Sequence, residues 1–232
     1  AVKAAKEVGY PVILKPVSGG GGKGMYVAHD EDELKDILDT LVDLKKINYY
    51  FEHYIERSRH IEVQIVADNY GEVIHLGERE CSIQRRNQKL LEESPSIALT
   101  HEMRKQVGTL AVKAAKSVHY SNVGTVEFLL DLKDNQFYFM EINPRIQVEH
   151  GVTEEVTGID IVRTQIRIAA GEPLDITQAD VHFQGHAIEC RINAEDPAAD
   201  FRPCPGKVEF LHFPGGPGVR VDSALYNGCT LS

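Results

Sequence analysis

The chain has 232 residues, 42% of them hydrophobic and 26% charged, which is typical of a folded protein with one large or two small domains. Its formal net charge of −10 argues against nucleic-acid binding through a broad basic face, so an anionic ligand must meet a local basic cluster. No apolar run approaches the roughly 20 residues of a membrane span, and the first residues lack a secretory signal, so we expect a cytoplasmic protein without membrane contact.

Both ends of the chain interrupt predicted elements. Val2, Ala5 and Val8 have helical spacing before Gly9 stops the pattern, and the last residues follow a strand-like segment. We therefore expect the chain to be part of a longer protein.

A glycine-rich segment, residues 18–24, joins two short predicted strands at residues 12–15 and 25–28. Its residues differ from those of a Walker loop, and no helix follows it directly, which excludes that motif. A plain flexible loop is one interpretation. Four consecutive glycines beside Lys15 and Lys23 favour a hairpin tip whose backbone N–H groups close on phosphate oxygens.

The segments that follow are predicted to form helices and strands with a structural role. Asp30 is a good N-cap for a helix over residues 31–45, and a strand is expected over residues 49–55. A hairpin turn at residues 68–71 predicts an antiparallel return over residues 73–76.

A strand is also expected over residues 60–66. Its alternation places His60, Glu62 and Gln64 on one face. That face can be solvated or can face a ligand, and the pattern does not decide between the two.

Residues 78–89 form the most basic segment of this acidic chain. Three cations lie close to three amide side chains, which favours an anion or nucleotide site over a solvated charge run. The cations are Arg85, Arg86 and Lys89, and the amides are Gln84, Asn87 and Gln88. A scaffold helix is expected after this segment, over residues 100–118.

Two acidic side chains are predicted to face each other across a hairpin. If residues 133–135 form its loop, Glu127 pairs with Glu141 and Thr125 with Asn143. Opposed carboxylates are destabilising unless a proton or cation lies between them, so we expect magnesium or manganese there, with Asn143 as a third oxygen ligand. A two-residue turn would put the acids on opposite faces, and two solvated acids on a strand edge are the alternative.

Pro144 ends regular pairing. If the chain stays extended beyond it, Arg145, Gln147 and Glu149 point one way while Ile146 and Val148 anchor the other side. Such a set can hold and deprotonate a small oxyanion acid, with the basicity of Glu149 set by Arg145 and the metal.

The C-terminal part changes character. A helix is expected over residues 159–170, followed by a strand-rich region from residue 186 with strands over residues 207–213 and 219–221. We therefore place a domain boundary near residue 180.

Together these motifs resemble the biotin carboxylase family of ATP-grasp enzymes, over essentially the whole chain. The resemblance rests on the Lys15 strand with its glycine lid, residues 59–64, 81–86 and 124–128, Glu141 to His150, and residues 189–197. It implies an α+β ATP-grasp fold, with antiparallel sheets and flanking helices, over residues 1–180. Residues 1–55 would form the lid subdomain, and residues 181–232 the beginning of a β-rich C-terminal domain.

The resemblance also assigns roles to residues. It implies that ATP is bound by Lys15, Gly20, Gly21, Gly22, Met25, Glu52, His53, Ile55, His60, Gln84 and Asn87. It implies two Mg²⁺ or Mn²⁺ ions on Glu127, Glu141 and Asn143, and a bicarbonate site formed by Lys89, Arg145, Gln147, Val148 and Glu149. Glu149 would be the base, Lys89 and Arg145 would act with it in catalysis, and Arg191 would stabilise the biotin enolate.

The implied function is ATP-dependent carboxylation of biotin by bicarbonate through carboxyphosphate, within acetyl-CoA carboxylase of fatty acid biosynthesis or a related carboxylase. The implied partners are biotin carboxyl carrier protein, carboxyltransferase and a second copy of the chain. Two positions depart from the family, which usually has His where this chain has Asn87 and Lys where it has His53. Asn87 would alter a nucleotide contact, and His53 a hinge position.

Two alternatives stay open: another ATP-grasp ligase, such as the carbamoyl phosphate synthetase large subunit, and a non-catalytic nucleotide-binding module. The resemblance further implies an N-terminal domain, with another lysine upstream, and further C-terminal residues outside this chain. We therefore expect the isolated chain to carboxylate biotin poorly or not at all.

Overall fold

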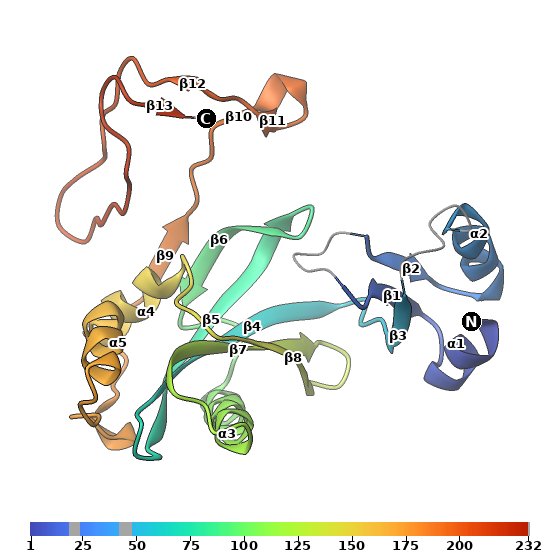
Figure 1. Ribbon diagram of the computed structural model, residues 1–232, viewed down its shortest axis with the longest axis horizontal. Coiled ribbons are helices and arrows are strands. Elements are labelled where there is room, and N and C mark those ends of the chain that lie inside the picture. Colours follow the sequence, from blue (N-terminus) through green and yellow to red (C-terminus); the bar gives the residue numbers. More distant parts are fainter. Residues whose placement is uncertain (19–23, 42–47, 232) are drawn as a thin grey trace. The chain divides into compact units, whose positions relative to one another are not determined.

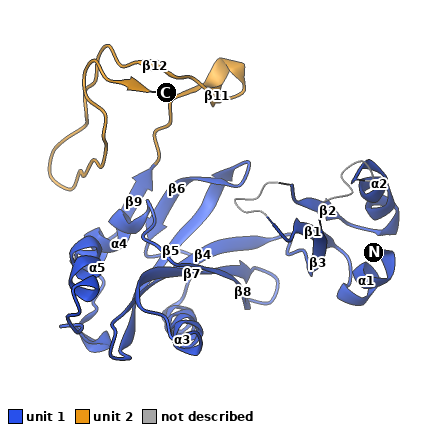
Figure 2. Ribbon diagram, viewed as in Figure 1, with its two compact units in different colours: residues 1–190 blue, residues 191–232 orange. Residues whose placement is uncertain are grey.

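The computed structural model describes residues 1–18, 24–41 and 48–231. The glycines expected to contact phosphate, and the end of the helix expected over residues 31–45, lie outside the described residues. The chain divides into two compact units, Ala1–Cys190 and Arg191–Ser232 (Figure 2). In the described part of the chain, no helix is long and apolar enough to cross a membrane.

The first elements form a small subdomain around a three-stranded antiparallel sheet with strand order β2-β1-β3 (Figure 1). Its elements are α1 (Val2–Val8), β1 (Val12–Pro16), β2 (Tyr26–Ala28), α2 (Glu31–Leu41) and β3 (Tyr49–His53). Leu14 of the sheet and Leu34 of α2 are fully buried in its core. Asp30 accepts hydrogen bonds from the backbone N–H groups of Asp32 and Glu33, which confirms the predicted cap.

A six-stranded antiparallel sheet with strand order β8-β7-β4-β5-β6-β9 forms most of the first unit. Its strands are β4 (Ser58–Ala67), β5 (Val73–Arg85), β6 (Gln88–Ser94), β7 (Asn122–Asp131), β8 (Phe137–Asn143) and β9 (Ala187–Cys190). Ile61, Val63 and Ile65 pack beneath α3 (His101–Ser117). The opposite face of β4, with His60, Glu62 and Gln64, is left for the site. The α+β fold of antiparallel sheets and flanking helices is confirmed.

Two further helices follow β8 on the chain, α4 (His150–Thr157) and α5 (Ile161–Ala169). Ile161 and Ile168 of α5 form a second core with Val66, Ile74 and Leu76 at one end of the sheet. The helix α4 and the strand β6 were not predicted from the sequence, and β5 continues nine residues beyond its expected end, from residue 76 to Arg85.

The second unit contains only short regular segments among its described residues. β10 (Glu195–Asp196) pairs with β11 (Arg202–Pro203), and β12 (Gly206–Lys207) pairs with β13 (Thr230–Leu231). Single 3₁₀ turns occur at Gln178–Asp180, in the first unit, and at Pro197–Ala199. The strands expected over residues 207–213 and 219–221 are wrong, since only Gly206–Lys207 is a strand there. β9 pairs with β6, so the first compact unit extends past residue 180 to Cys190.

Candidate active site

A row of charged residues crosses four neighbouring strands on the face opposite α3. Glu141 of β8 is the register partner of Glu127 of β7, Glu127 is that of Glu62 of β4, and Glu62 is that of Arg79 of β5. Register partners share a face of the sheet, so the three carboxylates and the guanidinium lie side by side. Antiparallel pairing alone therefore concentrates negative charge next to one buried cation.

The predicted pairing of Glu127 with Glu141 and of Thr125 with Asn143 is confirmed, but the loop that was expected to cause it is not. A loop of residues 133–135 would pair Leu130 with Tyr138, whereas Leu130 pairs with Phe137. Asp131 accepts the N–H of Lys133 in this longer turn. A β-bulge between Glu127 and Phe128 then shifts the register back.

Lys89 lies at the centre of this acidic group. Its Nζ donates to Glu62, to Glu127 Oε1 at 3.1 Å and to Glu149 Oε1 at 2.9 Å. The three carboxylates are at least 93% buried, and the Lys89 side chain is 15% exposed. One ammonium therefore offsets the repulsion between three acids and holds them around a single point.

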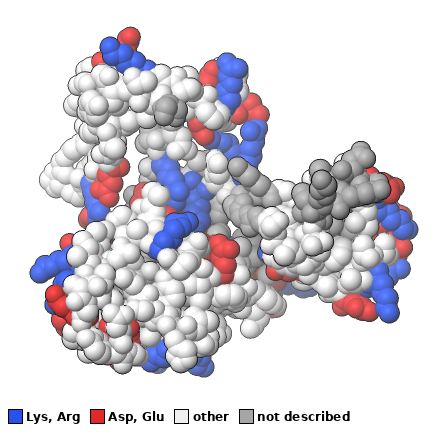
Figure 3. Space-filling view, viewed as in Figure 1, with Lys and Arg blue, Asp and Glu red and all other residues white. Residues whose placement is uncertain are grey.

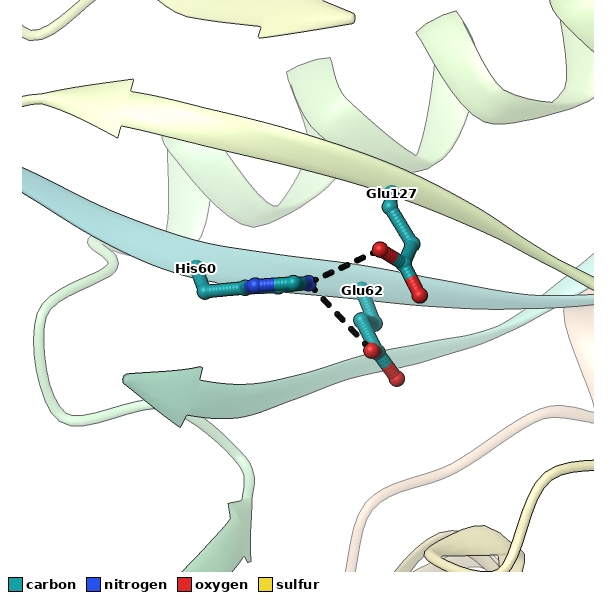
Figure 4. Close-up of side chains that lie close together, drawn as sticks. All are labelled: His60, Glu62 and Glu127. Carbon is teal, nitrogen blue, oxygen red and sulfur yellow. Dashed lines mark ion pairs between the residues drawn. The ribbon is translucent and has the colours of Figure 1, made fainter. Parts of the chain in front are cut away.

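His60 contacts two of the same carboxylates (Figure 4). Its Nε2 lies 3.1 Å from Glu127 Oε2 and 3.3 Å from Glu62 Oε1. Gln84 Nε2 donates to the Cys81 carbonyl oxygen at 2.8 Å and lies 3.1 Å from His60 Nδ1. Because that amide group is a donor, Nδ1 is the acceptor and the ring proton lies on Nε2, facing the acids. The face of β4 whose role the sequence left open thus faces the site.

Glu127 is the most heavily contacted carboxylate of the site. Besides Lys89 and His60, its Oε1 accepts from Asn143 Nδ2 at 2.9 Å and from Gln147 Nε2 at 3.1 Å. Burial raises the pKa of Glu127, but His60 and Lys89 outweigh burial and bring this pKa to about 2. Glu127 is therefore ionised throughout the physiological pH range.

The donor set around Glu127 fits a hard divalent cation. Asn143 Nδ2 also lies 3.2 Å from Glu141 Oε1, so one amide bridges the two opposed carboxylates. An amide can turn its oxygen toward the same point, which would give a cation three oxygen ligands. His60, Glu62 and Glu127 also offer ligand atoms within 4.8 Å of one another, so His60 and Glu62 extend the set beyond the residues that the sequence proposed.

The segment after Pro144 reaches the site differently from the prediction. It is not extended, because the His150 N–H donates to the Gln147 carbonyl oxygen in a turn that leads into α4. The expected anchoring by Val148 is wrong, since that residue is 62% exposed. Ile146 does pack, against the core beneath α5. Gln147 and Glu149 are 4% and 2% exposed and point into the cluster because of the turn.

The environment of Glu149 corrects a second expectation. Burial raises the pKa of Glu149, but Lys89 and Arg79 outweigh burial and lower it overall. Arg145, which was expected to set this basicity, is exposed, and in the described part of the chain it donates to the Ile146 carbonyl oxygen at 3.3 Å.

The expected nucleotide-binding residues of the small subdomain are brought together in part. Lys15 Nζ lies 2.5 Å from Glu52 Oε2, and His53 Nδ1 lies 3.1 Å from the Gly9 carbonyl oxygen. Met25 and Ile55 are half-buried. Their roles stay predictions.

Two other expected site residues lie at special positions. Asn87 occupies the β5–β6 turn with φ 64°, a left-handed value that asparagine tolerates better than most residues. Arg191 is the first residue of the second unit, so its role also stays a prediction.

Arg79 and Thr153 were not predicted as site residues, and Glu62 was given no role. All three side chains are fully buried, and Arg79 hydrogen-bonds to the other two. No signal in the sequence placed Arg79 in the site, because extending the β4–β5 hairpin without its observed β-bulge would have paired Arg79 with Ile61 on the opposite face.

One face of the molecule shows how its charged residues are distributed (Figure 3). In the space-filling view, Lys and Arg gather in small groups beside Asp and Glu, and most of the visible surface is uncharged (Figure 3). Among the residues coloured there, no broad basic face is seen.

Comparisons with known proteins match the whole chain. Residues 1–177 match the family model described as carbamoyl-phosphate synthase L chain, ATP binding domain, and residues 189–232 match the biotin carboxylase C-terminal domain. Biotin carboxylase 1 of Bacillus subtilis (strain 168) is 55% identical, over 100% of this chain and 52% of that protein. Biotin carboxylase of a Nostoc species is 56% identical, over 97% of this chain and 51% of that protein. The chain spans about half the length of the curated relatives it matches.

Solved structures agree with these matches. The biotin carboxylase domain dimer of Hydrogenobacter thermophilus 2-oxoglutarate carboxylase, in complex with MgADP, ADP and bicarbonate, matches with a TM-score of 0.93 and 51% identity. Biotin carboxylase of Campylobacter jejuni, in a β,γ-ATP complex, matches with a TM-score of 0.92 and 46% identity. Each match covers 100% of this chain and 52% of the other.

Proposed function

Because the chain belongs to the biotin carboxylases, within the wider family of carbamoyl-phosphate synthase L-chain ATP-binding domains, we propose that the protein is an ATP-dependent ligase that carboxylates biotin with bicarbonate. One observation carries the proposal most directly. Three residues expected to hold bicarbonate lie together: Lys89 and Gln147 both donate to the buried Glu127 carboxylate, and Lys89 also donates to Glu149. A cationic donor, an amide donor and an ionised acid around one point suit a small anion that must lose a proton.

The first step is the activation of bicarbonate. Lys89 and the Gln147 amide orient the anion, and Glu149, which its neighbours keep ionised, accepts its proton. The freed oxyanion attacks the γ-phosphorus of ATP, and the bond to the ADP oxygen breaks, which yields ADP and carboxyphosphate. Lys15 lies in the subdomain expected to hold the phosphates.

Glu127, Glu141 and Asn143 are the residues that would hold magnesium or manganese. A divalent ion bound there supplies positive charge to the phosphate oxygens of the nucleotide. Asn143 connects the two carboxylates, which the strand register places on one face of the hairpin.

The second half of the reaction transfers the carboxyl group to biotin. Carboxyphosphate breaks down to CO₂ and phosphate, and the phosphate removes the proton from N1′ of biotin. The ureido enolate then attacks CO₂ and gives carboxybiotin. Arg191 is the cation that we assign to the enolate.

We assign the protein to a biotin-dependent carboxylase located in the cytoplasm. Its partners would be a biotin carboxyl carrier protein, a carboxyltransferase and a second copy of the chain. The finer proposal is acetyl-CoA carboxylase of fatty acid biosynthesis. Relatives named for pyruvate and 2-oxoglutarate carboxylases are similarly close in sequence. Two experiments decide between the systems: which partner proteins co-purify with the protein, and which acyl or keto acid accepts the carboxyl group.

The test uses the full-length protein that contains this chain. Bicarbonate-dependent ATP hydrolysis, stimulated by free biotin, is expected for the wild type, and Glu149→Gln is expected to lose it. Glu155→Gln is the matched control, because Glu155 is an exposed residue of α4. Unchanged turnover in Glu149→Gln would refute the role of this residue as the base.

A second candidate is favoured by the description of the family model that matches residues 1–177, which names carbamoyl-phosphate synthase. Product analysis separates the two. Carboxybiotin formed from biotin supports the first proposal, and carbamoyl phosphate formed from ammonia or glutamine supports the second. Neither product, with nucleotide binding retained, would indicate a non-catalytic module.

A further inference from the structure

Arg79 is fully buried at the centre of the sheet, and its two terminal nitrogens make five hydrogen bonds. Nη1 donates to Gln64 Oε1 at 2.7 Å and to Thr153 Oγ1 at 3.0 Å. Nη2 donates to Glu62 Oε2 at 3.3 Å, to Thr125 Oγ1 at 3.0 Å and to Gln147 Oε1 at 3.1 Å. One guanidinium thus connects β4, β7, the turn before α4 and α4 itself.

The contact with Gln147 decides which end of that amide faces the anion site. Its Oε1 accepts from Arg79, so its Nε2 must point away from Arg79, and it does point to Glu127 Oε1 at 3.1 Å. Without a donor at this place, the amide could turn over and present an acceptor to an anion. Arg79 therefore keeps Gln147 in the donating orientation.

The hydrogen bond from Arg79 to Glu62 orients Lys89, through the other oxygen of that carboxylate. Arg79 holds Glu62 Oε2, which leaves Oε1 to accept from Lys89 Nζ. The same ammonium reaches Glu149. The orientation of Lys89 thus depends on a carboxylate that Arg79 fixes.

We propose that Arg79 is a positioning residue for bicarbonate, which aims the Gln147 amide directly and the Lys89 ammonium through Glu62. This inference rests on the proposed biotin carboxylase function. Arg79 is fully buried and its terminal nitrogens donate to side chains of the cluster, so it acts through Gln147 and Glu62. The Nε–H of Arg79 has no hydrogen-bond partner among the described residues. The position of the side chain therefore satisfies the terminal nitrogens Nη1 and Nη2 and leaves Nε unsatisfied.

Lysine cannot replace this arginine. A guanidinium presents five N–H donors in a planar fork, whereas an ammonium presents three donors from one atom. Arg79→Lys keeps the charge that Glu62 needs but cannot reach acceptors on four segments at once. The substitution therefore separates the positioning of Gln147 and Lys89 from the simple presence of positive charge.

The experiment measures steady-state ATP hydrolysis by the full-length protein with bicarbonate and ATP varied separately. Arg79→Lys is expected to raise the KM for bicarbonate about tenfold to a hundredfold, as outer partners of ligand groups do, with the KM for ATP changed less than about threefold. Arg104→Lys is the matched control. Arg104 also pairs with a buried acid, Glu78, but lies on the α3 side of the sheet. It is expected to lower thermal stability without changing either KM.

Three outcomes separate the inference from the proposed function. A wild type without bicarbonate-dependent hydrolysis refutes the function and this inference with it. If the wild type is active, two results for Arg79→Lys refute the inference but not the function. One is an unchanged KM for bicarbonate, and the other is an equal rise in the KM values for bicarbonate and ATP. If Arg79→Lys does not fold, Thr153→Val decides, since it removes one acceptor of Arg79 outside the anion site. It should raise the bicarbonate KM about twofold to fivefold, and an unchanged value overturns the proposal.

Discussion

Lys89 and Glu149 are 60 residues apart in the sequence and are joined by a hydrogen bond of 2.9 Å between Nζ and Oε1. The same ammonium, at the start of β6, contacts Glu62 and Glu127, so strands β4 and β7 and the turn that precedes α4 meet at one cation. Three acids share this cation, and its removal would leave all three without their common partner.

Lys89→Gln is expected to lower kcat/KM for bicarbonate about 100-fold or more, because a cationic donor to the anion is lost. It should also lower the free energy of unfolding by about 3 kcal/mol, since buried carboxylates lose their partner. Kinetics and thermal unfolding measure the two effects. Lys35→Gln, on an exposed ion pair of α2, is the control and should change stability by less than about 0.5 kcal/mol. Activity of Lys89→Gln within threefold of the wild type, a range of about 0.6 kcal/mol, would contradict the assigned role.

Glu141→Gln is expected to weaken metal binding about tenfold, because the exposed carboxylate opposite Glu127 loses its charge. Electron paramagnetic resonance of Mn²⁺, titrated with and without ATP, measures this affinity independently of turnover. Glu102→Gln, on the exposed face of α3, should leave the affinity unchanged. Equal Mn²⁺ affinity in Glu141→Gln and the wild type would remove Glu141 from the metal site.

Asp68→Asn is expected to lower the free energy of unfolding by about 1–2 kcal/mol at pH 7. Asp68 Oδ1 accepts from the N–H groups of Tyr70 and Glu72, and Oδ2 accepts from that of Leu174, so one carboxylate joins the β4–β5 turn to the segment after α5. Burial raises the pKa of Asp68, but these backbone donors outweigh burial and lower it.

A lowered folded-state pKa means that the carboxylate stabilises the fold above its unfolded pKa and that this stability is lost as the pH falls through the folded value. The difference between wild type and Asp68→Asn should therefore shrink as the pH falls below about 4. Urea unfolding at several pH values measures it. A difference that stays constant down to about pH 2 would show that ionisation of Asp68 does not matter.

Gly77→Ala is expected to destabilise the protein by about 2–4 kcal/mol. Gly77 has φ 81°, and a Cβ built there would overlap Cζ of Phe183, whose ring also lies 5.9 Å beneath the Arg104 guanidinium. Gly71→Ala is the matched control, because Gly71 has φ 99° but no atom within 4 Å of the added Cβ. It should cost only the backbone strain, about 1 kcal/mol. Equal losses in thermal unfolding would show that the Phe183 contact adds nothing.

Local chemistry in the sequence was enough for much of the scaffold. Asp30 marks a helix start, since its side chain accepts a backbone N–H of the first turn. Alternation placed His60, Glu62 and Gln64 on one face of a strand, and hairpin pairing placed Glu127 opposite Glu141. These features depend on residues close in sequence or on strands joined by a short turn.

Only the tertiary structure decided which residues come together in the site. The bulge beside Glu127 was invisible because a sequence shows neither the length of a turn nor the residue left unpaired. Gln147 and Glu149 enter the cluster through a helical turn that period-two reasoning cannot produce. Arg79 meets Gln147 and Thr153 across 68 and 74 residues, and such contacts arise from how strands and helices pack, which no local pattern specifies.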